Sequence, residues 1–310
     1  MYVLSHEVFT PRSPRPDRVA VVLSEPVAAC ETPSRWGKLA MLINIGTGTS
    51  LDFAEFGDAD GPPLVMICGT TQSYALWGDL AKAFSGHRVI CYDHRGMGAS
   101  ERGGGTISMA SLADDLDALL DVLGVARAHV LGWSLGSAVG QELAISHPDR
   151  VASLILWGTW PKVDGFQTSL LAALRYPWTT GDIPAALAAL GVAFSPELLD
   201  SPDFASLMEA ALPTFPQTDI QIATTLEQWE ADLLHDTTDR LGGITAPTLV
   251  VAGAQDLLTP PWQCKKVADA IPGARYELFE GPGSSHALGI ERAGEFVPLV
   301  LGFLADHPLG

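Results

Sequence analysis

Basic residues are scarce in this chain of 310 residues, in which 18 lysines and arginines stand against 36 aspartates and glutamates. Proteins that bind nucleic acid or anionic membrane surfaces need clustered cations to displace counterions, and a formal net charge of −18 argues against both partners. We therefore expect no nucleic-acid and no membrane partner, and we interpret the acidity as a source of solubility.

Cysteines and long apolar runs are also few. The four cysteines, Cys30, Cys68, Cys91 and Cys264, have neither CxxC nor metal-ligand spacing, so no disulfide framework is expected. This usage fits a reducing compartment, and we expect a cytoplasmic protein. No His/Asp/Glu cluster has ligand spacing either, which argues against a catalytic metal. No apolar run reaches the roughly 18 residues that span a bilayer.

The first 40 residues stand apart from the remainder. Three arginines precede the apolar residues 19–23, and residues 27–30 look like a lipoprotein cleavage box. Ser24, Glu25 and Pro26 interrupt the apolar region, which is shorter than a usual signal core. We interpret residues 1–40 as an irregular extension, or as upstream sequence from an early start codon, with Met41 as an alternative start.

From Leu42 onward, apolar runs with strand character alternate with helical patterns. The hydrophobic fraction of 47% is ample for a globular core. The expected strands are residues 51–56, 63–68, 88–92, 128–132, 151–156, 247–252 and 275–279. Most are apolar on both faces, as a parallel sheet covered by helices requires. Leucines from Leu112 to Leu123 recur at helical spacing. The pattern predicts an α/β fold with a mostly parallel, doubly wound sheet.

The alternation breaks between residues 161 and 236. This segment is rich in leucine, alanine and tryptophan, and its pattern predicts short helices near residues 167–175, 183–190, 202–212 and 219–234. Strand character returns at Pro247. We expect a core formed by residues 41–160 and 237–310, with a helical cap of residues 161–236 inserted between strands 6 and 7.

The strongest chemical signal is Gly132-Trp133-Ser134-Leu135-Gly136, which follows an expected strand and precedes an expected helix. A sharp turn in this context exposes a strained serine as a nucleophile, and glycines flank it because side chains would collide with the strand and helix. A chance GxSxG in a chain with 31 glycines is the alternative. The strand–turn–helix context favours Ser134 as a catalytic nucleophile.

A serine hydroxyl needs a base, and the base needs an orienting acid. Asp256 and His286 follow successive expected strands, in the chain order Ser–acid–His that this kind of site uses. A helix-capping or turn role for Asp256, and a solvated loop position for His286, are the alternatives. Asp236 is a second candidate for the acid.

The oxyanion of acyl transfer needs hydrogen-bond donors. We expect them to be the backbone N–H groups of Leu135 and of Thr70, which follows Gly69 in the loop after strand 63–68. The alternative is that this loop only turns the chain.

The pocket wall is expected to include Gly69, Trp133 and Trp160, with Trp178 and Trp229 as further candidates. For the last three residues, plain core packing is an equal alternative.

The serine motif, the segment Asp93–Ser100 and the loops of Asp256 and His286 together resemble the alpha/beta-hydrolase superfamily over about residues 42–304. The resemblance is strongest to 3-oxoadipate enol-lactonases, small-molecule esterases and polyketide-tailoring methylesterases. It implies an ester or lactone substrate, no cofactor and a helical cap. One departure is Cys68-Gly69, where the family often has a histidine that supports the oxyanion loop.

The expected activity is hydrolysis of a carboxylic ester or lactone of a small, largely apolar molecule, through an acyl-enzyme on Ser134. Carbon–carbon bond hydrolases, thioesterases and cofactor-free haloperoxidases share these motifs and are alternatives. A ligand-binding or isomerising protein on the same scaffold is another, although binding alone would not require all three residues. Apart from the substrate, a second copy of the chain, in a homo-oligomer, is the other partner considered.

Overall fold

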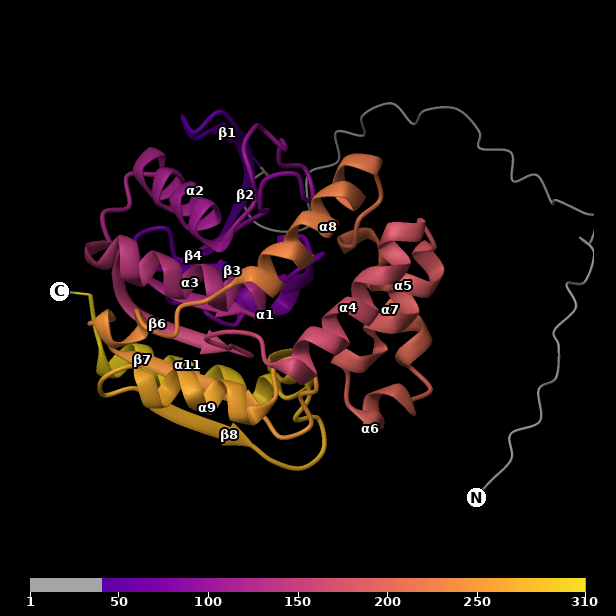
Figure 1. Cartoon of the computed structure of the whole chain (residues 1–310). Coiled ribbons are helices and arrows are strands. Elements are labelled where there is room, and N and C mark those ends of the chain that lie inside the picture. Colours follow the sequence, from indigo (N-terminus) through magenta and orange to yellow (C-terminus); the bar gives the residue numbers. More distant parts are fainter. Residues whose placement is uncertain (1–40, 310) are drawn as a thin grey trace, which may run out of the picture. The chain divides into compact units, whose positions relative to one another are not determined.

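The computed structural model describes residues 41–309, so our interpretation of residues 1–40 lies outside the described residues (Figure 1). Eight strands form one sheet in the order β1-β2-β4-β3-β5-β6-β7-β8. Their bounds are β1 Met41–Asn44, β2 Ser50–Gly57, β3 Pro63–Ile67, β4 Arg88–Tyr92, β5 Ala128–Trp133, β6 Val151–Trp157, β7 Thr248–Gly253 and β8 Arg275–Phe279. In this order, the six strands from β4 to β8 pair in parallel. The β1–β2 and β2–β4 pairs are antiparallel. The expected fold class is confirmed.

Helices cover both faces of the sheet. One face packs against α2 (Met109–Val122), α3 (Leu135–Ser146) and α9 (Pro261–Ala270), and the other packs against α1 (Gly78–Lys82) and α11 (Ala293–Asp306). Alternate residues of β3 enter the two cores, because successive side chains of a strand point to opposite faces. This explains why the central strands are apolar at most positions.

Helix α2 illustrates how the local sequence sets these elements. The Ser108 hydroxyl oxygen caps the helix by accepting from the backbone N–H of Ser111. The Ser111 hydroxyl oxygen in turn accepts from the backbone N–H of Ser108, which completes a capping box. The cap starts the helix three residues before the first leucine of the expected pattern. Leu112, Leu116 and Leu119 are fully buried, and each such leucine contributes about 1.5–3 kcal/mol of hydrophobic stabilisation.

A helical segment separates β6 from β7 (Figure 1). Its helices are α4 Gly165–Thr180, α5 Ile183–Ala189, α6 Pro196–Leu199, α7 Phe204–Ala211 and α8 Asp219–Leu234. Residues of α4, α5, α7 and α8 share an apolar core, distinct from the two cores of the sheet. At the base of the segment, Lys162 and Asp236 form an isolated antiparallel bridge, with Lys162 Nζ 2.8 Å from Asp236 Oδ2. The two ends of the insertion therefore lie side by side.

The short helix α6 was not expected from the sequence. Pro196 at its first position and Ser195, whose hydroxyl accepts from the Leu198 N–H, together start it. No helix within residues 41–309 is both long enough and apolar enough to cross a bilayer.

Candidate active site

Ser134 occupies the turn that joins β5 to α3, with φ of +55° and ψ of −124°. Residues other than glycine rarely adopt a positive φ, so the surrounding structure must hold the serine in this strained conformation. A Cβ atom on Gly132 would lie 2.2 Å from the Gly136 carbonyl oxygen, and one on Gly136 would lie 2.2 Å from that of Ile67. Both glycines of the motif are therefore needed for the close packing of strand, turn and helix.

The structure brings His286 and Asp256 into direct contact. His286 follows β8, Asp256 follows β7, and His286 Nδ1 lies 2.8 Å from Asp256 Oδ2. Asp256 Oδ1 accepts bonds of 2.8 Å from the backbone N–H groups of Leu258 and Thr259. Thr259 Oγ1 donates to Oδ2 at 2.7 Å. A carboxylate oriented by these donors can hold the proton of His286 on Nδ1 and leave Nε2 free to accept one.

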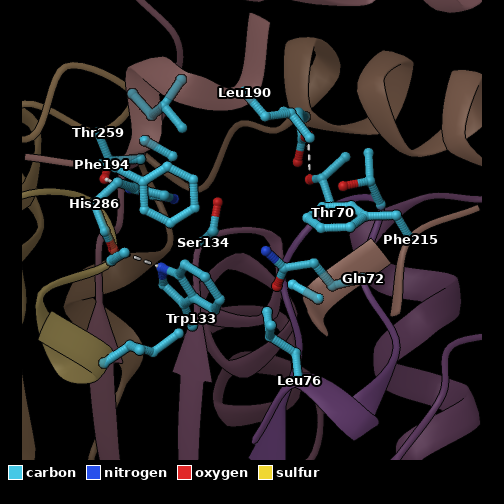
Figure 2. A pocket seen from close by; sticks show the side chains of 18 of the residues that line it. Thr70, Gln72, Leu76, Trp133, Ser134, Leu190, Phe194, Phe215, Thr259 and His286 are labelled. Atoms are coloured by element: carbon cyan, nitrogen blue, oxygen red, sulfur yellow. Dashed lines mark hydrogen bonds between the residues drawn. The ribbon is translucent and has the colours of Figure 1, made fainter. Parts of the chain in front are cut away.

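Ser134 and His286 line the same pocket (Figure 2). In that view, Ser134 lies between the His286 loop on one side and Thr70 and Gln72 on the other. Asp236, the second candidate for the acid, lies instead at the base of the helical segment in an ion pair with Lys162.

Trp133 both lines the pocket and fixes the His286 loop. Its indole Nε1 donates to the carbonyl oxygen of His286 at 2.9 Å, and its ring stacks on Trp157 with centroids 4.7 Å apart. Gly158 has a φ of +62°, and a Cβ there would lie 3.0 Å from His286 Cε1. Close packing on two sides therefore restricts the imidazole.

The loop after β3 carries the residues expected to bind an oxyanion. Gly69 and Thr70 line the pocket, and a Cβ on Gly69 would lie 3.2 Å from Ser134 Cβ. Thr71 has a φ of +70°, and its N–H donates to Gln228 Oε1 at 2.9 Å. Leu135 is the first residue of α3, so its N–H has no partner within the helix. The N–H of Thr71 is engaged, and those of Thr70 and Leu135 remain the candidates for the oxyanion hole.

The buried ring of His94 supports this loop from the segment Asp93–Ser100. His94 Nε2 lies 3.3 Å from the carbonyl oxygen of Cys68. Burial lowers the pKa of His94 to about 4, so the ring is neutral near pH 7 and donates through Nε2–H. The loop thus has a histidine support although Cys68 replaces the histidine that is common in the family.

Glu291 joins the helical segment to the loop of His286. Its carboxylate accepts from the Ser195 N–H at 3.0 Å, from the Ser195 hydroxyl, and from the Ser285 hydroxyl at 2.6 Å. Ser195 precedes α6 and Ser285 precedes His286. One carboxylate therefore holds a cap residue and a neighbour of the candidate base.

Of the tryptophans proposed for the pocket wall, Trp133, Trp160 and Trp229 line it. Trp178 is not among the lining residues and packs in the apolar core of the cap. Most of the remaining cap wall is apolar, and its side chains include Leu171, Leu190, Phe194, Leu207, Met208 and Phe215.

The sequence analysis did not single out Gln72, Gln228 or Asp232. Gln72 and Asp232 line the pocket, and Gln228 and Asp232 are one helical turn apart on α8. The sequence places polar residues at helical spacing on one face of α8. Such a pattern is equally typical of a solvent-exposed helix face, so it does not by itself predict a pocket wall. No group of three or more histidines, cysteines or acidic residues within residues 41–309 is placed to bind a metal ion.

Comparison with known proteins identifies the family. The model of the family described as "alpha/beta hydrolase fold" matches residues 62–292, which is well over half of the chain. The chain belongs to the alpha/beta-hydrolase family. Among the curated relatives of this hydrolase is a protein of Azorhizobium caulinodans named "Putative carbamate hydrolase RutD". The two are 31% identical over 268 residues, which cover 83% of this chain and 99% of RutD.

Two solved structures extend this similarity. A hydrolase from Pseudomonas aeruginosa PA01 is 30% identical, with a TM-score of 0.75, over 86% of this chain and 98% of its own. The enol-lactonase from Burkholderia xenovorans LB400 is 29% identical, with a TM-score of 0.75, over 84% of this chain and 98% of its own. The expected resemblance of this hydrolase to its superfamily is confirmed.

Proposed function

We propose that this hydrolase cleaves a carboxylic ester or lactone of a small, largely apolar molecule through an acyl-enzyme on Ser134. One observation carries the proposal. Ser134, held at positive φ, lines the same pocket as His286, and His286 Nδ1 is hydrogen-bonded to the buried carboxylate of Asp256. Nucleophile, base and orienting acid are the three roles that nucleophilic acyl transfer needs.

In the acylation step, Ser134 Oγ attacks the substrate carbonyl carbon while His286 Nε2 takes the hydroxyl proton. Asp256 keeps the Nδ1–H tautomer and stabilises the imidazolium as it forms. The N–H groups of Leu135 and Thr70 donate to the oxyanion of the tetrahedral intermediate. As that intermediate collapses, His286 returns the proton to the departing alcohol or enol oxygen.

In deacylation, a water molecule takes the position of the leaving group and gives a proton to His286. The resulting hydroxide attacks the acyl carbon, and Ser134 leaves with the proton restored to it. The apolar cap wall stabilises the substrate by burying its hydrocarbon portion.

Carbamate hydrolysis is a second candidate for the same site. The similarity to RutD supports it, as the similarity to the enol-lactonase supports lactone cleavage. A carbamate carbonyl reacts through the same serine and oxyanion hole, so the two candidates differ only in the acyl group that the pocket accepts.

A substrate panel tests the proposal. It comprises a phenyl ester, an enol-lactone, a phenyl carbamate, a thioester and a diketone whose carbon–carbon bond can be cleaved. A separate assay measures peracid-dependent bromination. We expect ester or lactone turnover without diketone cleavage or bromination, and a loss of at least about 10⁴-fold in kcat for Ser134→Ala. Near-wild-type turnover by folded Ser134→Ala would exclude Ser134 as the nucleophile.

A further inference from the structure

One carboxyl group interrupts the largely apolar cap wall of the pocket. Asp232 on α8 lines the pocket with only 2% of its surface exposed. Its Oδ2 accepts a hydrogen bond of 2.7 Å from Thr70 Oγ1, which Figure 2 marks beside Thr70. Its Oδ1 is buried and has no hydrogen-bond partner within residues 41–309. A buried acceptor without a partner is destabilising unless something else completes its bonding.

The position of this free oxygen links it to the reaction centre. Thr70, which holds the carboxyl, follows Gly69, whose Cα faces Ser134 closely enough to place a Cβ 3.2 Å from Ser134 Cβ. The carboxyl is therefore one hydrogen bond away from the loop that lies against the nucleophile. Asp232 and Ser134 line the same pocket, so a substrate whose carbonyl carbon lies at Ser134 Oγ shares that pocket with the carboxyl group.

Other polar atoms of the wall are also unpartnered. The indole N–H groups of Trp160 and Trp229 are buried, both residues line the pocket, and neither donates to any atom within residues 41–309. Gln72, which lines the pocket together with Ser134, also has a buried side-chain oxygen, Oε1, without a hydrogen-bond partner within residues 41–309. A purely hydrocarbon substrate would leave all of these groups without partners, whereas a substrate with its own polar atoms would satisfy them.

We infer that Asp232 Oδ1 accepts a hydrogen bond from an N–H or O–H group of the substrate close to its scissile carbonyl. The inference rests on the proposed function for the location of that carbonyl. It makes Asp232 a specificity-determining residue, because a substrate that lacks the donor leaves a buried carboxylate oxygen without a partner. The preferred substrates are then acyl compounds with a donor group beside the carbonyl, either esters and lactones that carry a hydroxyl group there or primary carbamates.

Burial raises the pKa of Asp232 to about 7, and the hydrogen bond from Thr70 acts in the opposite direction. A second donor on Oδ1 would stabilise the charged form further. The test below is therefore made at pH 8, where the carboxylate predominates and Oδ1 is an acceptor.

The test compares phenyl carbamate with phenyl acetate, which differ by an amino group in place of a methyl group of similar size. Phenol release gives kcat/KM for each, and the ratio of the two values cancels any general effect on catalysis. In Asp232→Asn, the side-chain amide oxygen can keep the bond from Thr70. The side-chain NH2 group then takes the place of Oδ1 and presents a donor to the substrate. We expect the carbamate-to-acetate ratio to fall on the order of 10- to 100-fold.

Thr70→Val is the matched control, because it changes the other member of this pair: it removes the Thr70–Asp232 hydrogen bond but leaves the carboxylate, and with it Oδ1, in place. We expect it to lower both rates alike and to keep the ratio within about threefold, since no donor–acceptor contact to the substrate changes. A ratio in Asp232→Asn that stays within threefold of the wild-type ratio would overturn the inference.

A binding measurement separates this inference from the proposed function. In Ser134→Ala, quenching of tryptophan fluorescence reports affinity for the two phenyl compounds without turnover. We expect tighter binding of the carbamate, and loss of that preference in Ser134→Ala/Asp232→Asn. Equal affinities in Ser134→Ala would overturn the subsite even if the wild type is an active hydrolase. A carbamate preference in a wild type that cleaves neither compound would overturn the proposed reaction and keep the subsite.

Discussion

Replacing Asp256 by asparagine changes one atom of the site and inverts the hydrogen bonds at that atom, of which the bond to His286 decides the outcome. In the native site, Oδ1 accepts from the backbone N–H groups of Leu258 and Thr259, each at 2.8 Å. An asparagine with its oxygen at the Oδ1 position keeps both bonds. The flipped amide would place its own N–H groups against two donors, at a cost of about 1–3 kcal/mol for each unsatisfied group. The backbone therefore fixes the orientation of the new amide.

In that orientation, the asparagine amino group faces His286 Nδ1 where Oδ2 lay at 2.8 Å. Nδ1 must then accept, so the ring carries its proton on Nε2 and cannot take the proton of Ser134. We expect kcat for ester hydrolysis to fall by about 10⁴-fold, which corresponds to roughly 5 kcal/mol of transition-state stabilisation. Steady-state kinetics on a phenyl ester, with circular dichroism to verify folding, give the measurement.

Thr259→Val provides the comparison. It removes the 2.7 Å bond from Thr259 Oγ1 to Asp256 Oδ2 but leaves the carboxylate and the imidazole tautomer unchanged. The expected loss is no more than about tenfold, as for one ordinary hydrogen bond. If folded Asp256→Asn retained activity within tenfold of the wild type, the tautomer argument would be refuted and Asp256 would not be the orienting acid.

Three further predictions concern parts of the site that hold these groups in place. In Gly136→Ala, the new Cβ would collide with the Ile67 carbonyl 2.2 Å away and displace the oxyanion loop, so kcat should fall on the order of 10²-fold; unchanged kinetics would contradict the packing argument. His94 has a folded pKa of about 4 against 6.5 unfolded, so its stabilising contribution is present above pH 6.5 and is lost toward pH 4. Urea unfolding at pH 7.5 and 4.5 should show the stability difference between wild type and His94→Gln shrinking by roughly 2–3 kcal/mol, and a constant difference would refute it. Glu291→Gln offers one acceptor oxygen to the donors of Ser195 and Ser285, so it should lower the free energy of unfolding by about 1–3 kcal/mol and reduce kcat/KM; equal melting temperatures would exclude this link between cap and core.

Much of the fold could be predicted because its physical causes lie within short segments. Strands buried on both faces require apolar residues at most positions, and the runs at residues 63–68, 88–92 and 128–132 show this directly, with Arg88 and His129 as exceptions. Helix α6 escaped prediction because it has only four residues and depends on Ser195 and Pro196 rather than on periodicity.

The candidate site divides in the same way. Ser134, Asp256 and His286 could be proposed because each follows a strand of a parallel sheet, and such strands bring their carboxyl ends to one edge. Asp232 could not be proposed, because its contact with Thr70 joins residues 162 positions apart and depends on how α8 packs over the sheet.

The support of the oxyanion loop shows the same limit. The sequence revealed that Cys68 stands where the family often has a histidine, but not that the neutral His94 reaches its carbonyl from the loop after β4. Such a substitute support is a tertiary contact, and no local pattern specifies it.

Labelling with a fluorophosphonate, followed by mass spectrometry to locate the adduct, tests the central claim most directly. The reagent reacts with serines whose hydroxyl is activated by a neighbouring base. The account predicts a single adduct on Ser134 in the wild type, none in Ser134→Ala, and strongly slowed labelling in Asp256→Asn. A folded wild type that takes up no label, or takes it up elsewhere than Ser134, would contradict the assignment of an activated serine to this pocket.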